Sequence, residues 1–178
     1  MRIHSTPKLY LSLILCSLLA ACVSSNQLDV ADLEGAEIFN FRAPAGNVVA
    51  SGQPTPSQLG VAARAGVKHV INLRAPGEEI NFDESGVVNS LGMQYHNIPV
   101  AGGAGVNEEN AASLQALLDS FGGEPVLVHC ASSNRVGALM ALSANAGGAS
   151  VDDAIAEGVR WGLSSERLTE VVRNNLSN

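Results

Sequence analysis

The sequence has few cysteines, no excess of positive charge and no internal repeat. Its 178 residues include three cysteines, too few for a disulfide-rich scaffold. Ten lysines and arginines stand against 17 aspartates and glutamates, and the resulting net charge of −7 argues against nucleic acid or an anionic membrane surface as a partner. The one low-complexity tract is Ala101–Gly105. The length of the chain after a signal at residues 1–21 is enough for one domain with a sizeable core.

Residues 1–21 have the pattern of an export signal. Basic residues precede the apolar run Leu9–Ala20, which is too short to span a membrane comfortably. Leu19–Cys22 resembles the bacterial lipobox, in which the signal is removed before a cysteine that carries diacylglycerol; an ordinary secretory signal is the alternative. We therefore expect lipid attachment at Cys22 and a location on the periplasmic side of the cell envelope. Val23 after the cysteine favours the outer membrane.

Export also changes the meaning of the cysteines. Cys16 leaves with the signal and Cys22 is acylated, so Cys130 is the one free thiol expected in the mature protein. An exported compartment favours paired cysteines, yet here no intramolecular disulfide can form. A single thiol kept in that setting favours a chemical role over simple packing.

Cys130 stands in the most informative stretch of the chain. The apolar run Val126–Val128 leads into His129 and Cys130, four small residues, Arg135 and an Ala/Leu-rich helix pattern. A strand that ends at a cysteine and turns into a helix directs backbone N–H groups and the positive helix end to one point. That field favours the thiolate, and Arg135 adds a two-pronged donor for phosphate or sulfate oxygens. We predict an oxyanion site with a cysteine nucleophile; an inert buried cysteine is the alternative.

Strand and helix patterns alternate along the rest of the chain. Strands are predicted at residues 47–51, 67–73, 93–100 and 125–130, and helices at 56–65, 82–91, 107–121, 135–146, 151–158 and 165–175. This alternation predicts an α/β fold with a small, mostly parallel sheet of four to five strands and helices on both faces. Ligands bind beyond the carboxyl ends of such strands, where Cys130 lies. Residues 22–37 are expected to be a lipidated tether without fixed structure, and 38–178 the folded domain.

Three short signatures follow one another along the chain: Ser51–Pro54, Val70–Arg74 with Gly77–Glu79, and Val128–Arg135. Together they resemble the cysteine-dependent protein tyrosine and dual-specificity phosphatases, and most closely the beta-lactamase-hydrolase-like phosphatase family. The resemblance implies a dual-specificity-phosphatase-like fold with the nucleophile loop between the last core strand and a helix. It also implies a two-step transfer, without metal or other cofactor, in which Cys130 attacks phosphorus and water hydrolyses the phosphocysteine.

The resemblance also assigns roles to individual residues. The phosphate-binding set is one loop and the arginine after it: Ala131, Ser132, Ser133, Asn134 and Arg135. His129 would support the loop, and a satisfied core histidine is the alternative. Asn72 and Arg74 would line the pocket, unless they form only a turn at the end of a strand.

Four positions depart from the family pattern. Cys130 and Arg135 enclose four residues where tyrosine phosphatases have five, a spacing shared with rhodaneses. Ser133 stands where glycine is common and would be strained at a positive φ. Val136 stands where serine or threonine is common. Ala101–Gly105, in the loop where related enzymes carry an acidic aspartate, has no carboxylate and is either a flexible connection or a mobile lid.

A general acid must therefore come from elsewhere in the chain. Candidates on the loop after the second predicted strand are Glu78, Glu79, Asp83 and Glu84. Further candidates are Glu108 and Glu109 at the next helix start, where stabilisation of the helix dipole is the alternative explanation.

These observations favour a lipid-anchored phosphatase acting on aryl or protein (tyrosine) phosphate esters. A rhodanese-like sulfurtransferase with a persulfide on Cys130 is one alternative, and a pseudophosphatase that only binds oxyanions is another. The expected partners are a phosphate ester or phosphoprotein substrate and the membrane, through the N-terminal lipid.

Overall fold

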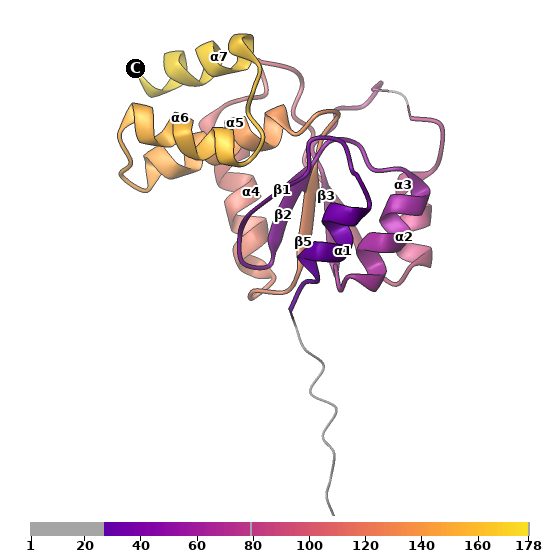
Figure 1. Cartoon of the computed structure of the whole chain (residues 1–178). Helices are drawn as coiled ribbons and strands as arrows, with labels where there is room; N and C mark the ends of the chain where they lie inside the picture. Colours follow the sequence, from indigo (N-terminus) through magenta and orange to yellow (C-terminus); the bar gives the residue numbers. More distant parts are fainter. Residues whose placement is uncertain (1–26, 79, 178) are drawn as a thin grey trace, which may run out of the picture.

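Four short parallel strands and one antiparallel edge strand form the sheet of the computed structural model, which describes residues 27–78 and 80–177 (Figure 1). The strands lie in the order β1-β2-β5-β3-β4. Their bounds are Arg42–Ala45 for β1, Val48–Ser51 for β2, His69–Asn72 for β3, Gln94–Asn97 for β4 and Val126–His129 for β5. The sequence-based prediction of a small, mostly parallel sheet is confirmed.

The two central strands, β3 and β5, are buried along their whole length, as their apolar sequences predict. The edge strand β1 was not predicted, because its residues are largely exposed and include Pro44, which suits an edge position. It pairs antiparallel with β2 through an irregular register.

Helices cover both faces of the sheet. Val49, Val70 and Leu127 point to one face and belong to the core cluster shared with α1, α2 and α3. Their neighbours Ala50 and Ile71 point to the other face, where the cluster includes residues of α4 to α7. The helices are α1 Val30–Gly35, α2 Pro56–Arg64, α3 Glu84–Ser90, α4 Glu108–Ser120, α5 Asn134–Ala146, α6 Val151–Arg160 and α7 Glu166–Leu176. In Figure 1, α6 and α7 lie together beside α5, on which both pack.

The expected tether is partly wrong. Asp29 caps the start of α1, and Leu28 and Leu33 are buried in the core, so the chain is already folded from Leu28 onward. The sequence analysis did not predict this helix, because it is short and has one leucine and therefore no apolar periodicity. Packing against the core stabilises it. The predicted signal at 1–21 and the lipid site at Cys22 lie outside the described residues. No helix within 27–78 and 80–177 is long and apolar enough to cross a membrane.

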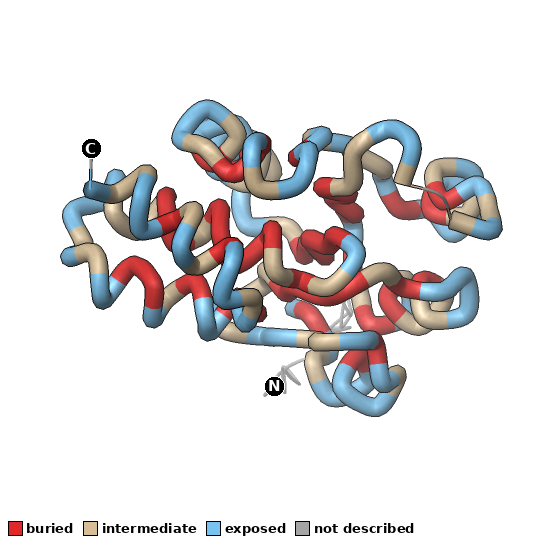
Figure 2. Tube along the Cα trace, turned by 90° about the horizontal axis from the view of Figure 1, so that it is seen from above, coloured by how far each residue is buried: buried red, intermediate tan, exposed pale blue. Residues whose placement is uncertain are grey.

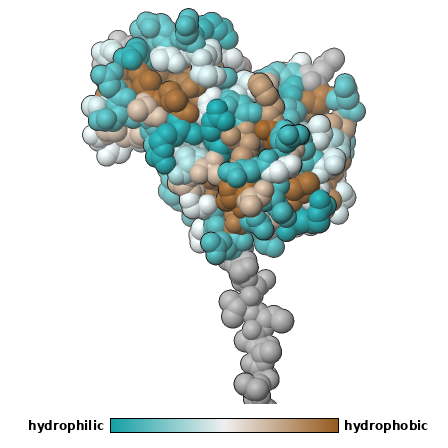
Figure 3. Space-filling view, viewed as in Figure 1, coloured by the Kyte–Doolittle hydropathy of each residue, from teal (hydrophilic) through white to brown (hydrophobic). Residues whose placement is uncertain are grey.

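The buried residues lie along the strands and the inner sides of the helices, whereas the outer turns are exposed (Figure 2). On the face drawn in Figure 3, hydrophobic residues form separate patches among hydrophilic ones. Trp161 is 3% exposed and packs in the helical core, and its Nε1 donates to Glu157 Oε1 at 2.7 Å.

One helix start differs from all the others in the described chain. Helices α1, α2, α3, α4, α6 and α7 each have an N-cap side chain that accepts a hydrogen bond from a backbone N–H of the first turn. The N-cap of α5, Ser133, makes no such bond and lies in the left-handed region at φ 63°. The first N–H groups of α5 are therefore not satisfied by their own cap, as suits a helix end that receives an anion.

Candidate active site

The site is built where β5 turns into α5, at the carboxyl edge of the parallel strands. Parallel register aligns Ser51, Asn72 and His129, the last residues of β2, β3 and β5. The chain then passes through Cys130 and the loop Ala131–Ser133 into α5. This is the predicted location of the nucleophile loop.

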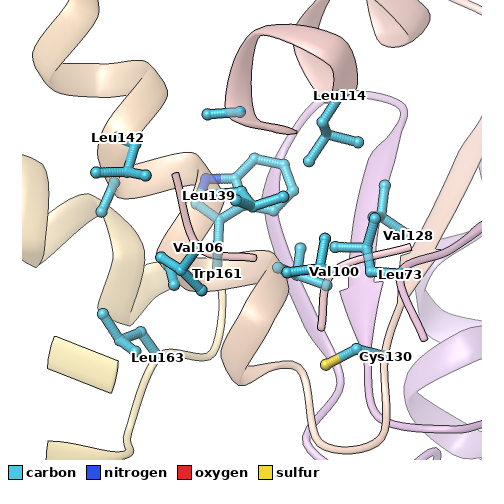
Figure 4. Close-up of a cluster of buried hydrophobic side chains, with 14 of the residues drawn as sticks. Leu73, Val100, Val106, Leu114, Val128, Cys130, Leu139, Leu142, Trp161 and Leu163 are labelled. Carbon is cyan, nitrogen blue, oxygen red and sulfur yellow. The ribbon is translucent and has the colours of Figure 1, made fainter. Parts of the chain in front are cut away.

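Cys130 is completely buried and is the one free cysteine in the described chain. Figure 4 shows it at the edge of the hydrophobic cluster formed with Leu73, Val100 and Val128. Its backbone N–H donates to Ser51 O at 3.4 Å, which continues the pairing of β5 with β2. The thiol therefore lies on a rigid strand end with one apolar side.

The loop after Cys130 is fixed by hydrogen bonds to distant parts of the chain. Asn40 Nδ2 donates to Ser132 O at 2.8 Å and to Gly162 O at 3.1 Å. Ser133 is fully buried, and its Oγ donates to Trp161 O at 2.9 Å. The positive φ considered for Ser133 from its sequence position is thus present, and a buried hydrogen bond stabilises the strained residue.

Asn134 joins the loop to the start of α7. Its Oδ1 accepts hydrogen bonds from the backbone N–H groups of Ser164 and Ser165, both at 2.7 Å. Its Nδ2 lies 3.2 Å from Ser132 Oγ. The side chain therefore couples the nucleophile loop to the segment between α6 and α7 and does not project freely toward a ligand.

An open cleft of about 620 Å³ lies in front of this loop. Its walls come from four places in the chain, including Glu78, Gly102, Ser132, Arg135 and Arg167. The glycine-rich segment predicted as a connection or lid thus forms part of the wall. Arg167, in the first turn of α7, was missed by sequence reasoning because no motif surrounds it.

Arg135 is paired with Glu78 in this structure. Its Nη1 donates to Glu78 Oε1, and its Nη2 donates to Glu78 Oε2 at 2.7 Å. Nη1 also donates to Val100 O at 2.9 Å. The hydrogen bonds from Arg135 hold the pKa of Glu78 below its ordinary value of 4.5, against the opposing effect of burial. The same bonds raise the pKa of Arg135, so the guanidinium is firmly charged.

A buried polar network underlies the loop. Glu84 is 3% exposed and accepts hydrogen bonds from Gln53 Nε2 and Asn72 Nδ2, both at 2.6 Å. His129 Nε2 lies 3.1 Å from Glu84 Oε1, and Arg74 Nη1 donates to Gln53 Oε1 at 2.8 Å. The network joins residues from all three sequence signatures, which explains why they occur together.

Burial raises the pKa of Glu84, but the interactions with His129, Gln53 and Asn72 outweigh it and leave this pKa below 4.5. Glu84 is therefore an ionised structural group and not a proton donor to a ligand in the cleft. His129 is fully buried beside it, and the supporting role that the resemblance implies for this histidine stays a prediction.

The other predicted residues are more scattered. Asn72 and Arg74 line a smaller neighbouring cavity of about 250 Å³, which shares Ala75 and Glu78 with the main cleft. Glu78 Oε2 lies 3.6 Å from Arg74 Nε. Glu108 borders a different cavity, between α4 and α5. Glu79 lies outside the described residues. Of the candidate acids in the described chain, Glu78 alone lines the main cleft.

Within the described ranges, no group of three or more histidine, cysteine, aspartate or glutamate side chains could hold a metal ion. The site consists of a thiol, a helix start, two arginines and one carboxylate.

A cysteine at the end of a central parallel strand, a tight loop and an arginine in the first helical turn define the class of cysteine-dependent phosphatase folds. Residues 40–147 match the family described as beta-lactamase hydrolase-like protein, phosphatase-like domain, and the chain belongs to this family. This confirms the resemblance found in the sequence.

Individual relatives agree with this assignment. The beta-lactamase hydrolase-like protein of Xylella fastidiosa (strain Temecula1) is 36% identical over 97 residues, which are 52% of this chain and 22% of that protein. This chain thus spans about a fifth of the length of that curated relative. A solved DUF442 protein from Shewanella putrefaciens CN-32 is 25% identical with a TM-score of 0.62, over 83% of this chain and 96% of that one.

A more distant structure has the same fold. The core catalytic domain of the PP-IP phosphatase SIW14 from S. cerevisiae aligns with a TM-score of 0.60 at 17% identity, over 76% of this chain and 84% of that one. At this identity the likeness concerns the fold alone.

Proposed function

We propose that the domain hydrolyses aryl or protein (tyrosine) phosphate esters through a phosphocysteine on Cys130. The observation that carries this proposal is the junction of β5 and α5, where a fixed loop joins the thiol to a helix start without its own cap. Such a start offers backbone N–H groups to the equatorial oxygens of a phosphate. Arg135 lines the main cleft beside this loop and supplies the positive charge that a transferring phosphoryl group needs.

The surroundings of Cys130 suit a nucleophile more than a packing residue. The loop that follows it is held by Asn40, by the bond of Ser133 to Trp161 O and by the bond of Asn134 to Ser164 N. A strained residue at φ 63° stabilised in this way is more readily explained by a site than by packing alone. Membership of a phosphatase-like family supports the same reaction class.

The proposal places the domain at the cell envelope. The sequence pattern Leu19–Cys22 supports cleavage before Cys22 and attachment of diacylglycerol, with the domain on the periplasmic side of the outer membrane. Metabolic labelling with radioactive palmitate tests this step. Label in the wild-type protein and none after Cys22→Ala supports the anchor; equal labelling of both excludes it.

The test of the reaction is turnover of p-nitrophenyl phosphate by the purified protein in reducing buffer. We expect turnover that vanadate inhibits and that Cys130→Ser abolishes. Gln115→Ala is a suitable control, because this residue of α4 is exposed and does not line the main cleft. Turnover that survives Cys130→Ser would refute a phosphocysteine mechanism.

The two alternatives give different results in the same preparation. Transfer of sulfur from thiosulfate to cyanide without phosphate release would identify a sulfurtransferase, for which the four-residue loop is the supporting observation. Binding of inorganic phosphate with neither reaction would identify a pseudophosphatase.

A further inference from the structure

Two arginines of the described chain line the main cleft, one from the nucleophile loop and one from α7. Glu78 and Val100 O take both hydrogens of Arg135 Nη1 and one of Nη2, so the edge with Nε and the other Nη2 hydrogen remains for a phosphate. Arg167 is exposed and lines the same cleft. A single phosphate group on the loop accounts for Arg135 and leaves Arg167 without a role.

The local structure does not explain Arg167. It stands in the first turn of α7, where a positive charge opposes the helix dipole and a negative one would stabilise it. Within the part of the chain that the structure describes, no ion pair joins Arg167 to Glu166 or Glu170 of the same helix, whereas Arg173 on α7 pairs with Asp152. An unpaired cation at a helix start is better explained by a ligand than by folding.

The two arginines are held on one frame. Arg135 is the second residue of α5, and Arg167 is the second residue of α7. Asn134 Oδ1 accepts a hydrogen bond at 2.7 Å from the backbone N–H of Ser165, which caps α7. Leu168, next to Arg167, is 6% exposed and packs in the core. The two helix starts are therefore joined to each other, and both direct an arginine to one cleft.

The cleft has room for more than a phosphate group. Its volume of about 620 Å³ is in the range of sites that bind whole small molecules. In the described chain the remaining charged side chain on its wall is Glu78, which is already paired with Arg135. Arg167 thus leaves one positive charge on this wall in a chain of net charge −7, and Ala101 and Leu168 add apolar surface. This combination suits a substrate with a second negative group.

We propose that Arg167 binds a second anionic group, a carboxylate or a phosphate, on the substrate whose phosphate ester Cys130 attacks. This inference rests on the proposed phosphatase function and names its substrate class, which is phosphate esters with a further acidic group on the leaving alcohol. The planar guanidinium can hold two oxygens of such a group at once. Arg167 selects the substrate by binding and takes no part in the transfer of the phosphoryl group.

Binding of non-hydrolysable ligands tests the second anion without turnover. Phenylphosphonate has one anionic group, whereas 3- and 4-phosphonobenzoate add a carboxylate to the same ring. By calorimetric titration we expect the wild-type protein to bind one of the phosphonobenzoates about three- to tenfold more tightly than phenylphosphonate, as suits a charge-assisted bond at an exposed arginine. High salt should reduce this preference. Equal affinities for all three ligands, or binding of none, would overturn the proposal.

Arg167→Gln removes the charge, and Arg173→Gln is its matched control, because Arg173 is an exposed arginine of the same helix that does not line the main cleft. In Arg167→Gln the preference for the phosphonobenzoate should disappear, while phenylphosphonate binding weakens only a few-fold through the loss of a nearby positive charge. Arg173→Gln should keep the wild-type preference. A preference that survives in Arg167→Gln would exclude this residue as the binding group.

Phosphotyrosine peptides distinguish the source of the second anion. They are titrated into Cys130→Ser protein, which the proposed mechanism leaves unable to hydrolyse them. A peptide with aspartate beside phosphotyrosine that binds more tightly than its asparagine counterpart, and loses this advantage in Arg167→Gln, supports the site and assigns the anion to a protein substrate. A preference confined to the phosphonobenzoates supports the site and assigns it to a small molecule.

The assay with p-nitrophenyl phosphate separates this inference from the proposed function. Turnover by a wild-type protein that shows no preference for either phosphonobenzoate would overturn the second anion site and leave the phosphatase intact. A preference that depends on Arg167, in a protein without turnover, would support the anion site and refute the phosphatase reaction.

Discussion

The contact between Ser133 and Gly162 gives the sharpest stability prediction. Gly162 has a φ of +101°, and a Cβ built there would lie 2.6 Å from Ser133 Oγ and 2.7 Å from Ser133 Cβ. Gly162→Ala therefore adds backbone strain of about 1–2 kcal/mol and overpacking of about 1–3 kcal/mol. We expect a loss of about 2–5 kcal/mol in the free energy of unfolding.

A substitution of Ser133 separates the backbone strain of Gly162→Ala from its overpacking. Ser133→Gly relieves the left-handed strain at φ 63° but loses the bond to Trp161 O, worth about 0.5–1.5 kcal/mol. Alone it should change stability by no more than about 1 kcal/mol. In the double variant the alanine at 162 no longer meets Ser133, so Gly162→Ala should cost about 1–3 kcal/mol less than in the wild type.

Urea unfolding followed by circular dichroism measures all four proteins of this cycle. If the stability losses of the two single variants sum to that of the double variant within about 0.5 kcal/mol, the two sites are independent and the proposed contact is refuted. A thermal melt gives a second readout: for a domain of this size each kcal/mol shifts the Tm by about 2–4 °C.

Three further predictions concern pH, the buried network and the cleft. His96, which contacts His69, has its pKa lowered from 6.5 by burial and by that neighbour. The unfolded chain therefore binds more protons than the folded one, so the free energy of unfolding should fall as the pH drops below about 6.5. This fall should be smaller in His96→Gln. Glu84→Ala removes the acceptor of two buried amides at about 1–3 kcal/mol each, so urea unfolding should show a loss of about 2–5 kcal/mol, whereas Glu109→Ala should cost little. Arg167→Ala should raise KM for p-nitrophenyl phosphate a few-fold at constant kcat, as expected for an exposed charge worth about 0.5–1 kcal/mol; an unchanged KM would exclude contact with substrate.

Local patterns in the sequence predicted the framework of the site well. The apolar run before Cys130 and the small residues after it indicate a strand, a loop and a helix, and these are β5, the nucleophile loop and α5. The strain considered for Ser133 came from the family pattern, which commonly has glycine there, and the structure has a positive φ at this residue. These features depend on a few consecutive residues, and sequence patterns describe such features best.

The contacts that complete the site could not be predicted in the same way. Asn40 bonds Ser132 across 92 positions in the chain, and Glu78 bonds Arg135 across 57. No periodicity links such residues, because the pairing depends on where separate loops end in space. Arg167 was missed for the same reason.

The anchoring of the nucleophile loop has a consequence for how this domain can be divided. The family match ends at residue 147, yet Trp161, Gly162, Ser164 and Ser165, which contact the loop or Asn134, all lie beyond it. A fragment cut at the end of the family match would keep Cys130 and Arg135 and lose most of the supports that shape the backbone between them. A transplant of this site into another protein must therefore include α6 and the start of α7 as well as the residues of the family match.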